Sequence, residues 1–553
     1  MSLEEIIVAI AVTFLVLLLV AGGAIVSSKK PEFAGHPKGL YVLFFAEMWE
    51  RFSYYGMRAL LIFYLTQHWL FADDRASVIY GAYTALVYIA PVLGGYLADR
   101  YLGQRKAVLF GAVLLTCGHF LMAFEGGGGQ ADPTISVFWG ALAFIIVGSG
   151  FLKANISVIV GQLYPRTDVR RDGAYTIFYM GINVGAAVGT IIAGYLGQTY
   201  GWRYGFGAAG VGMLLGLIVF VVFKPLLMGK GESSVPEQLK APFMGIKFEW
   251  FLYLIGLLAV AVTWWLVQNQ AVVGSILGIF GALLVGYVIY TAVTKLERDD
   301  RDRIFAAMFL IFGSILFWAL FEQAGSSINL YTDRYVNRAG VDASIFQSIN
   351  PIYIILLAPL FAYLWTWLAR HGKEPSTPAK FGLAMIQLGF GFLVLVWGAS
   401  TFGAAATPVI FIFLLYLLHT TGELCLSPVG LSAMNRLAPA HMASLIMGTW
   451  FFASATGNFA AGLIAAATGA EGVEGGEGTG GSPETYLDVY TTVGWIAVGI
   501  GVAVILVSPL IKKLMHLDTL TDDEELAGYK ELGEKQGAGM FPQREEKPGR
   551  EEI

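Results

Sequence analysis

The chain has 553 residues, of which 56% are hydrophobic and only 14% are charged, and its formal net charge is -5. An ordinary soluble protein of this size would carry more charge on its surface, so the composition indicates a polytopic membrane protein. The lysines and arginines are scattered and form no basic stripe, which argues against nucleic-acid binding. Cys117 and Cys425 lie in apolar runs without metal-ligand spacing, so we expect no metal site.

The first apolar run covers residues 6–26 and is long enough to cross a hydrocarbon layer of about 30 Å. Two acidic residues precede this run and Lys29 and Lys30 follow it, which reverses the charge pattern of a secretory signal peptide. We therefore predict, within residues 1–36, an extra uncleaved transmembrane helix whose N-terminus lies outside the cell. We expect this helix to serve as an anchor or packing helix.

Six further apolar runs precede a polar stretch at residues 224–247, which contains glycine, serine and proline and has the composition of a linker. Two apolar runs and a charged cluster follow the linker, and six more apolar runs come before a polar tail. The expected domains are an N-terminal six-helix bundle at 37–224, a cytoplasmic linker with two extra transmembrane helices at 225–300, a C-terminal six-helix bundle at 301–515 and a cytoplasmic tail at 516–553.

The charges of the loops predict the orientation of these helices. One set of alternate loops is rich in lysine and arginine and includes the linker and the tail, whereas the other set carries only Arg75, Arg203, Arg334 and Arg338. Because basic loops stay in the cytoplasm, we expect a multi-pass protein of the cell inner membrane with a cytoplasmic C-terminus. Two bundles joined by a cytoplasmic linker are the plan of a secondary transporter with its site at the midplane between them.

The apolar run at residues 40–70 carries four ionisable residues near its middle. Glu47 and Arg51 are four residues apart, Glu50 lies beside them, and Arg58 follows two turns later on nearly the same face. A charge at the bilayer centre costs from about 3 to about 10 kcal/mol or more, so such residues usually face a partner or a water-filled cavity. A lone ion pair can serve only to fix helix packing. Two acids and two bases on one helix favour a transport or proton site.

Three more ionisable residues lie alone in apolar runs. Lys153 belongs to the N-terminal half, and Glu322 and Glu423 belong to the C-terminal half. A buried lysine needs a carboxylate or an anionic ligand as its partner. A zwitterionic substrate between the halves would satisfy both signs of charge. Salt bridges without a ligand are an alternative, and the two interpretations are compatible because the same pairs can act as gates during alternating access.

Three motifs resemble those of one transporter family. Residues 47–56 read EMWERFSYYG and resemble the ExxER motif of proton-dependent oligopeptide transporters, a branch of the major facilitator superfamily. Residues 94–103, GGYLADRYLG, resemble the superfamily's loop motif, and residues 178–185, FYMGINVG, are similar to the family's fifth-helix signature. The resemblance extends over residues 37–513. It implies an all-α membrane protein with the major facilitator fold of two six-helix bundles, here with two extra central helices and one extra N-terminal helix.

The resemblance implies proton-coupled import of di- and tripeptides, without enzymatic activity and without a cofactor other than protons as the coupling ion. It also implies roles for individual residues. Arg51 and Lys153 would bind the substrate carboxylate, and Glu423 would bind its amino group. Asn183 and Asn350 would hold the peptide backbone. The remaining pocket lining would be Tyr54, Tyr55, Tyr88, Trp318, Ser427 and Trp450.

The same resemblance assigns proton coupling to Glu47, Glu50 and Arg51. We expect that protonation of either glutamate frees Arg51 to bind the peptide carboxylate. Proton and peptide together would then favour inward opening, and both would leave to the cytoplasm. The expected partners are di- and tripeptides, protons and the lipid bilayer, with no nucleic acid, for a protein that functions as a monomer.

Two pairs of residues resemble the gates of the family. Arg58 with Glu322 resembles the outer gate pair, and Lys153 with Glu423 resembles a pair that breaks when peptide binds. One position departs from the family pattern, since Ala154 replaces the proline that usually follows the fourth-helix lysine. Loss of that proline restores a backbone donor and should straighten the helix. We expect consequences for transport rate or substrate size rather than for the role of Lys153.

Other functions stay open on the sequence alone. A family relative that carries nitrate, or another anionic or zwitterionic solute such as a peptide-like metabolite, would share the fold, although the intact set of Glu47, Glu50 and Arg51 resembles peptide carriers more than nitrate carriers. A membrane enzyme is disfavoured because no metal-ligand cluster, nucleophile elbow or phosphate loop lies in or beside the apolar runs. Saturable uptake would distinguish a carrier from a channel or a sensor.

Overall fold

The computed structural model describes residues 2–165, 168, 170–439, 442–469 and 481–517. Within these residues the chain is almost entirely helical, and 14 helical segments are long and apolar enough to cross a membrane. Helix α2 (Lys38–Phe63) adds a further span of 26 residues, and it carries the four central charges. The predicted fold class is confirmed. The part of the predicted tail after residue 517 lies outside the described residues.

The first bundle is built around α2. This helix packs against α6 and α7, while α3 and α4 pack against α5. Glycines on α6 let two helices approach backbone to backbone, since a Cβ at Gly185 or at Gly189 would collide with a carbonyl oxygen of α2. The other helices of this bundle are α3 (Asp73–Leu97), α4 (Gln104–Met122), α5 (Ile135–Gln162), α6 (Arg171–Tyr195) and α7 (Trp202–Val222).

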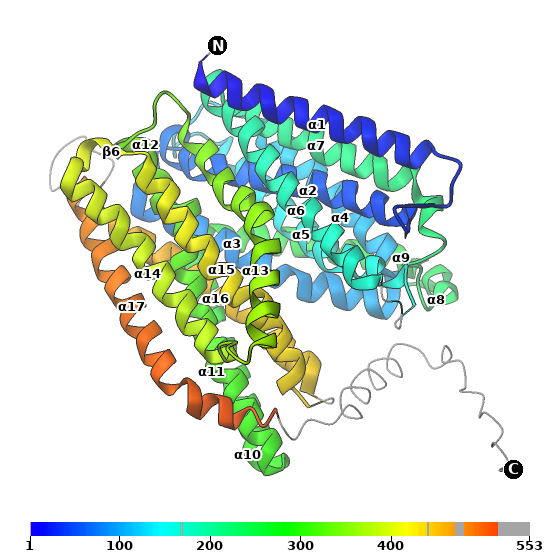
Figure 1. Cartoon of the computed structure of the whole chain (residues 1–553). Helices are drawn as coiled ribbons and strands as arrows, with labels where there is room; N and C mark the ends of the chain where they lie inside the picture. The colour runs from blue at the N-terminus through cyan, green and yellow to red at the C-terminus, as the bar shows by residue number, and fades with distance from the viewer. Residues whose placement is uncertain (1, 166–167, 169, 440–441, 470–480, 518–553) are drawn as a thin grey trace, which may run out of the picture.

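The second bundle lies beside the first (Figure 1). Within it α14 packs between α15 and α17, and α16 packs against α11 and also against α3 of the first bundle. In Figure 1 the two bundles meet near α12 and diverge from there. The helices of the second bundle are α11 (Arg298–Phe321), α12 (Ser327–Tyr335), α13 (Ile349–Arg370), α14 (Thr377–Phe402), α15 (Ile410–Leu437), α16 (Ala443–Gly469) and α17 (Pro483–Leu514).

Three long helices lie outside the two bundles. Helix α1 (Leu3–Ser27) runs along the outside of the first bundle, against α6 and α2 (Figure 1). After the linker, α9 (Phe248–Gln268) packs on α5, and α10 (Gln270–Lys295) contacts α9, α11 and α16. The short elements are the helix α8 (Pro236–Lys240), the hairpins β1 (Glu32–Phe33) with β2 (His36–Pro37) and β3 (Pro242–Phe243) with β4 (Ile246–Lys247), and the parallel pair β5 (Val336–Asn337) with β6 (Thr407–Pro408).

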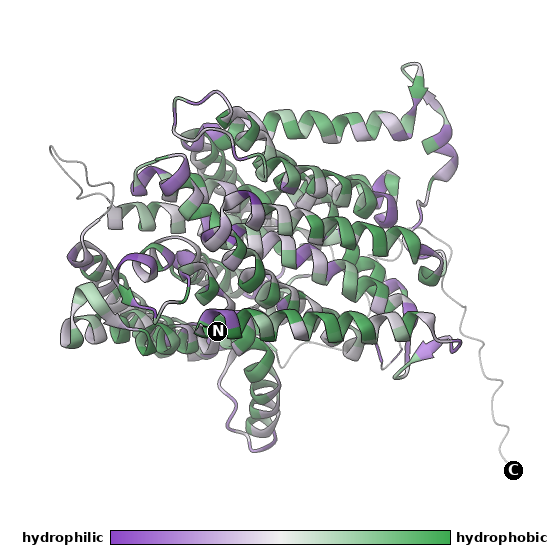
Figure 2. Ribbon diagram, turned by 90° about the horizontal axis from the view of Figure 1, so that it is seen from above, coloured by the Kyte–Doolittle hydropathy of each residue, from purple (hydrophilic) through white to green (hydrophobic). Residues whose placement is uncertain are grey.

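The outer surface of the helices is apolar, as a bilayer requires. Figure 2 shows hydrophobic colour along the helices and hydrophilic colour mainly at their ends and in the loops. Large side chains stand exposed on this surface, for example Leu283 of α10 at 67% and Val20 of α1 at 66%. The interior therefore holds the polar side chains that a soluble protein would place outside. Ionisable side chains inside membrane spans usually mark functional sites, so we expect the site in this interior.

The first of the six apolar runs after the charged cluster forms a broken helix in the structure. Helix α11 ends at Phe321, a 3₁₀ turn covers Glu322–Gly325, and α12 continues the span. The turn fits tightly against α3, because a Cβ at Gly325 would collide with the hydroxyl of Tyr80. The Gln323 amide donates to the carbonyl oxygens of Ala319 and Ala461, both at 3.0 Å, so the break does not leave these acceptors unpaired.

The ends of the bundles differ in how they meet. We call the end that carries the linker and His516 the linker end, and the end that carries α12 and the π-helical turn η1 (Tyr64–His68) the closed end. At the closed end α3 and α16 approach closely, since a Cβ at Gly81 would lie 2.7 Å from the Cα of Gly462.

Candidate substrate and proton site

The charged cluster of α2 lies in the interior of the first bundle. Every residue of α2 except Tyr55 is buried, and Tyr55 is half-buried. The Arg51 Nε donates to Glu47 Oε1 at 2.7 Å and lies 3.2 Å from Glu50 Oε2. The second Glu47 oxygen and both Glu50 oxygens are buried without a hydrogen-bond partner. Two carboxylates thus share one guanidinium, and a proton on either carboxyl would neutralise the excess negative charge of the group.

Lys153 approaches this cluster from α5. Its ammonium nitrogen lies over the ring of Tyr54, 4.0 Å from the centroid, and 5.6 Å from the ring centroid of Tyr88. Among the described residues, no carboxylate lies within ion-pair distance of this nitrogen. Helix α5 runs through Ala154 without interruption. A cation held only by aromatic faces is well placed to accept an anionic ligand.

Glu423 faces the opening between the bundles from α15. Its Oε2 accepts a hydrogen bond at 3.0 Å from the side-chain amide of Asn350, which also donates to Thr420 Oγ1 at 3.0 Å. Glu423 lies close enough to Tyr55 and Tyr179 for electrostatic interaction. The structure therefore brings the isolated acid of the second bundle towards the aromatic residues of the first.

The other predicted pocket residues are distributed over both bundles. Asn183 is buried and donates to the carbonyl oxygen of Tyr179 in its own helix at 3.1 Å. The indole nitrogen of Trp318 is buried without a partner. Trp450 is buried and packs edge-on against Phe381, while Ser427 is half-buried on α15. No described cluster of three or more His, Cys, Asp or Glu side chains is arranged to hold a metal ion.

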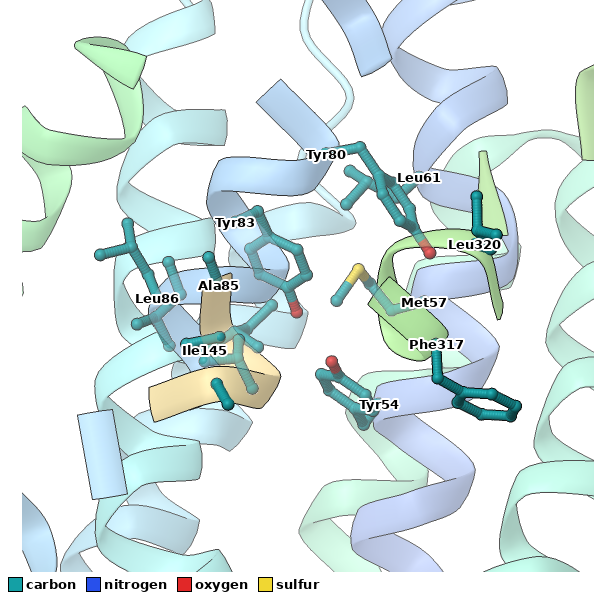
Figure 3. Close-up of a cluster of buried hydrophobic side chains, with 14 of the residues drawn as sticks. Tyr54, Met57, Leu61, Tyr80, Tyr83, Ala85, Leu86, Ile145, Phe317 and Leu320 are labelled. Carbon is teal, nitrogen blue, oxygen red and sulfur yellow. The ribbon is translucent and has the colours of Figure 1, made fainter. Parts of the chain in front are cut away.

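Arg58 joins the two bundles above this site. Its guanidinium forms an ion pair and hydrogen bond with Glu322, and its Nε donates to the hydroxyl of Tyr80 at 2.6 Å. Both charged side chains are less than 10% exposed. An apolar cluster surrounds the contact, and Figure 3 shows Met57 between the tyrosines of α3 and the side chains of α11.

Further contacts at the closed end were not predicted from the sequence. Asp73 of α3 binds Arg334 of α12 through both carboxylate oxygens, and one of these bonds measures 2.9 Å. Tyr486 of α17 adds a hydrogen bond to Asp73 at 3.4 Å. The Asn329 amide donates to the Ala59 carbonyl oxygen at 3.1 Å. The pattern of loop charges places Arg334 in a loop, and nothing in the sequence pairs it with Asp73.

The extra helix α1 also reaches the second bundle at the closed end. A Glu4 carboxylate oxygen accepts a hydrogen bond at 2.9 Å from the backbone nitrogen of Asp342, which precedes α13. The Asp342 side chain in turn accepts from Thr199 of the first bundle at 3.1 Å. Burial raises the pKa of the Asp342 carboxyl above its usual range. At the other end of α1, Lys38 donates to the carbonyl oxygens of Val26 and Ser28.

The linker end has a different character. The hydrogen bonds and ion pairs described above between the bundles all lie at the closed end or at the level of Arg58. Tyr179 and Met180 on α6 are 46% and 48% exposed, and Leu360 and Tyr363 on α13 are 61% and 71% exposed. The predicted pair of Lys153 and Glu423 is not formed among the described contacts. The structure is therefore closed at one end of the interface and open at the other.

Comparison with known proteins gives the family. A profile of the POT family matches residues 105–477. An uncharacterised transporter of Bacillus subtilis (strain 168) is 36% identical over 494 residues, which are 87% of this chain and 96% of that protein. A peptide transporter of Yersinia enterocolitica is 38% identical over 465 residues, covering 78% of this chain and 88% of the relative. The chain belongs to the POT family and is a membrane transporter rather than an enzyme.

Solved structures agree with this assignment. A crystal structure of a peptide transporter POT in complex with alafosfalin has a TM-score of 0.76 and 34% identity, and covers 90% of this chain and 99% of that one. A POT family transporter in complex with 5-aminolevulinic acid has a TM-score of 0.73 and 30% identity, and covers 87% of this chain and 98% of that one. The two-bundle fold is thus shared over nearly the whole length of these proteins.

Proposed function

We propose that the chain is a proton-coupled symporter that imports di- and tripeptides by alternating access. The observation that carries this proposal is the distribution of charge across the opening. Among the described residues, the groups that hold Lys153 on the first bundle are aromatic rings, and Glu423 on the second bundle is held by an amide. A short peptide carries a carboxylate and an ammonium group that are too far apart to neutralise each other, so it would complete both ends of the site.

Relatives support the substrate class. The Yersinia enterocolitica relative is named a peptide transporter, and a relative from Aliivibrio fischeri, 30% identical over 512 residues, is named a dipeptide and tripeptide permease. In our proposal Arg51 and Lys153 bind the peptide carboxylate and Glu423 binds the amino group. Asn183 and Asn350 hold the backbone, with Asn350 released from Glu423 as peptide enters. The aromatic lining is Tyr54, Tyr55, Tyr88, Trp318 and Trp450, and Ser427 completes the pocket.

Proton coupling is proposed for the buried cluster of Glu47, Glu50 and Arg51. Because one guanidinium serves two carboxylates, protonation of one of them loosens its hold on Arg51. Arg51 can then turn towards the peptide carboxylate. No cofactor other than the proton is needed in this scheme.

We further propose the orientation and the gates. Basic loops gather at the linker end, where Arg170 pairs with Glu32 and Lys106 pairs with Glu249. That end would be cytoplasmic, together with the C-terminus, and the N-terminus of α1 would lie outside. The conformation is then inward-open, with Arg58 and Glu322 as the outer gate and Lys153 and Glu423 as the pair that breaks on peptide binding. The proposed unit is a monomer in the cell inner membrane.

Uptake of labelled dialanine into proteoliposomes tests the proposal, with and without an inward proton gradient. We expect accumulation only with the gradient, blocked by trialanine but not by free alanine. The variants Glu47→Gln and Glu50→Gln should lose driven accumulation while retaining exchange of dialanine. Driven accumulation in both variants would show that these residues are not the coupling site.

A second substrate class has specific support. The POT family structure with 5-aminolevulinic acid holds a small zwitterion that is not a peptide. The charges of Lys153 and Glu423 would suit such a solute as well. Competition of dialanine uptake by 5-aminolevulinic acid and by nitrate distinguishes a peptide carrier from a carrier of these other solutes. Saturable uptake of one of these solutes without any uptake of dialanine would support a transporter whose substrate is that solute and not a peptide.

A further inference from the structure

The extra helix α9 and the bundle helix α4 border an apolar groove on the outer surface of the protein. The groove has a volume of about 700 Å³, and its walls are formed by aliphatic and aromatic side chains of both helices and of β4. Several of these side chains are widely exposed, including Trp250 at 61%, Leu254 at 53% and Val113 at 42%. In a membrane this surface faces hydrocarbon, so an acyl chain is the natural occupant of the groove.

One end of the groove carries a pair of opposite charges. The Lys106 ammonium of α4 donates to Glu249 Oε2 of α9 at 2.7 Å, and the Tyr253 hydroxyl donates to Glu249 Oε1 at 3.0 Å. The side chains of Lys106 and Glu249 are 34% and 25% exposed, so a ligand can reach both. Tyr253 is fixed in turn by stacking on Phe110 at a centroid distance of 4.9 Å.

The charged pair lies where a lipid headgroup would be. Helix α9 begins at Phe248 directly after the polar linker, and α4 begins at Gln104, so Lys106 and Glu249 both lie in the first turn of their helices. Val113 lies seven residues beyond Lys106, which is about 10 Å further along the helix. The groove therefore runs from the polar boundary of the membrane into its apolar layer.

Among the described side chains that line the groove, Glu249 at its mouth is the one charged residue, and Lys106 neutralises it. The neighbouring cations are engaged elsewhere, since Arg105 pairs with Glu232 at 2.5 Å and Lys240 pairs with Glu237 at 3.0 Å. Lys247 follows Ile246 in β4, and successive side chains of a strand point to opposite faces, so Lys247 points away from the groove that Ile246 lines. A zwitterionic headgroup fits this mouth better than an anionic one, whose charge Glu249 would repel.

We propose that this groove is a binding site for phosphatidylethanolamine. An acyl chain of the lipid lies along α4 and α9, the phosphate accepts a hydrogen bond from Lys106, and the primary ammonium donates to Glu249. A choline headgroup has no N–H to donate, so it would leave Glu249 with fewer donors once Lys106 turned to the phosphate. The bound lipid would also fill the space between α9 and the first bundle. The extra helices would then anchor the protein to one specific lipid.

Lipid binding to the purified full-length chain tests the proposal, measured by native mass spectrometry during titration with phosphatidylethanolamine, phosphatidylcholine or phosphatidylglycerol of matched acyl chains. We expect one phosphatidylethanolamine to bind about tenfold more tightly than either other lipid, as a charge-assisted hydrogen bond would provide. The double variant Lys106→Gln with Glu249→Gln keeps the size of both side chains and should abolish this preference. The matched control Lys240→Gln with Glu237→Gln removes an exposed ion pair of the linker and should preserve it.

A second variant tests the groove itself. Val113→Trp fills the apolar part without altering the charged pair, and it should weaken phosphatidylethanolamine binding about tenfold. Equal binding of the three lipids by the parent protein would overturn the proposal, and so would an unchanged preference in the double glutamine variant. Unchanged binding in Val113→Trp would overturn the placement of the lipid in this groove. Dialanine uptake is a separate measurement, so a failure of the proposed transport function is distinguishable from either result.

Discussion

The two ends of the interface between the bundles hold their charged residues in opposite ways. At the closed end, Arg58 and Glu322 neutralise each other across the bundles, and so do Asp73 and Arg334. Towards the linker end, Lys153 and Glu423 belong to different bundles, and in the described part of the chain each binds groups of its own bundle. Ion pairs thus hold one end shut, while the charges at the other end are available to a substrate.

This difference indicates which interactions determine the free energy of the conformational change. Opening the closed end must break buried ion pairs and let water reach their charges, whereas closing the linker end must bring Lys153 and Glu423 into contact or bridge them with a ligand. Variants at the two ends should therefore act differently on the equilibrium between the two conformations.

Arg58→Ala should have the largest effect on this equilibrium. It leaves the Glu322 carboxylate buried without its cation, a change that costs about 3–5 kcal/mol and that opening to water would relieve. Distances between spin labels at Tyr200 and Asn337, on different bundles at the closed end, should shift to longer values. The double variant Arg58→Gln with Glu322→Gln removes both charges and should recover the short distance. An unchanged distance distribution in Arg58→Ala would show that this pair does not hold the closed end.

Asp73→Asn should have the next largest effect. Arg334 keeps some water because its side chain is 25% exposed, so we expect a cost of about 2 kcal/mol against the closed end. The measurement is the labelling rate of a single cysteine placed by Thr332→Cys, in a chain with Cys117→Ser and Cys425→Ser, using an impermeant maleimide. Asp74→Asn is the matched control, since Asp74 is adjacent and exposed. Equal labelling rates in the two variants would contradict the conclusion that the ion pair of Asp73 with Arg334 holds the closed end together.

Glu4→Ala should have a smaller effect. It removes one acceptor from the backbone nitrogen of Asp342, which is worth about 1 kcal/mol, and it should lengthen the Tyr200 to Asn337 distance in a minor fraction of molecules. Burial raises the pKa of the Asp342 carboxyl, and its ionisation beside the Glu4 carboxylate places two like charges together. The closed end should therefore be most stable at low pH and lose this contribution as the pH rises through that raised pKa. Glu5→Ala removes the capping box of α1 instead, so the same change in both variants would assign the effect to helix stability.

Lys153→Gln should change the distances at the closed end least and still abolish peptide uptake. In this conformation the rings that hold Lys153 belong to its own bundle, and the pair with Glu423 would form only when the linker end closes, so the variant leaves the contacts of the closed end intact. We expect unchanged spin-label distances at the closed end together with loss of dialanine uptake in proteoliposomes. Retained uptake would remove Lys153 from the proposed substrate site, and a longer distance would mean that Lys153 helps to hold the closed end shut.

Much of the architecture could be read from the sequence because it depends on local properties. Apolar runs of sufficient length predict membrane helices wherever they occur. The spacing of Glu47 and Arg51 places them on one face of a helix, and the structure joins them by a hydrogen bond. The glycine of the motif at residues 178–185 that lies nearest α2, Gly185, allows the close approach of α2 and α6, because a Cβ there would collide with a carbonyl oxygen of α2.

The tertiary structure alone decided the partners across the bundles. Asp73 and Arg334 are 261 residues apart in sequence, and hydropathy places both merely at the ends of apolar runs. The turn after Phe321 fits closely against the hydroxyl of Tyr80, which lies on another helix. Which end is closed cannot follow from hydropathy at all, because both conformations bury similar apolar runs and differ by a few kcal/mol of contacts between the bundles. The sequence by itself determined the helices and their charges, and long-range packing determined which charges meet.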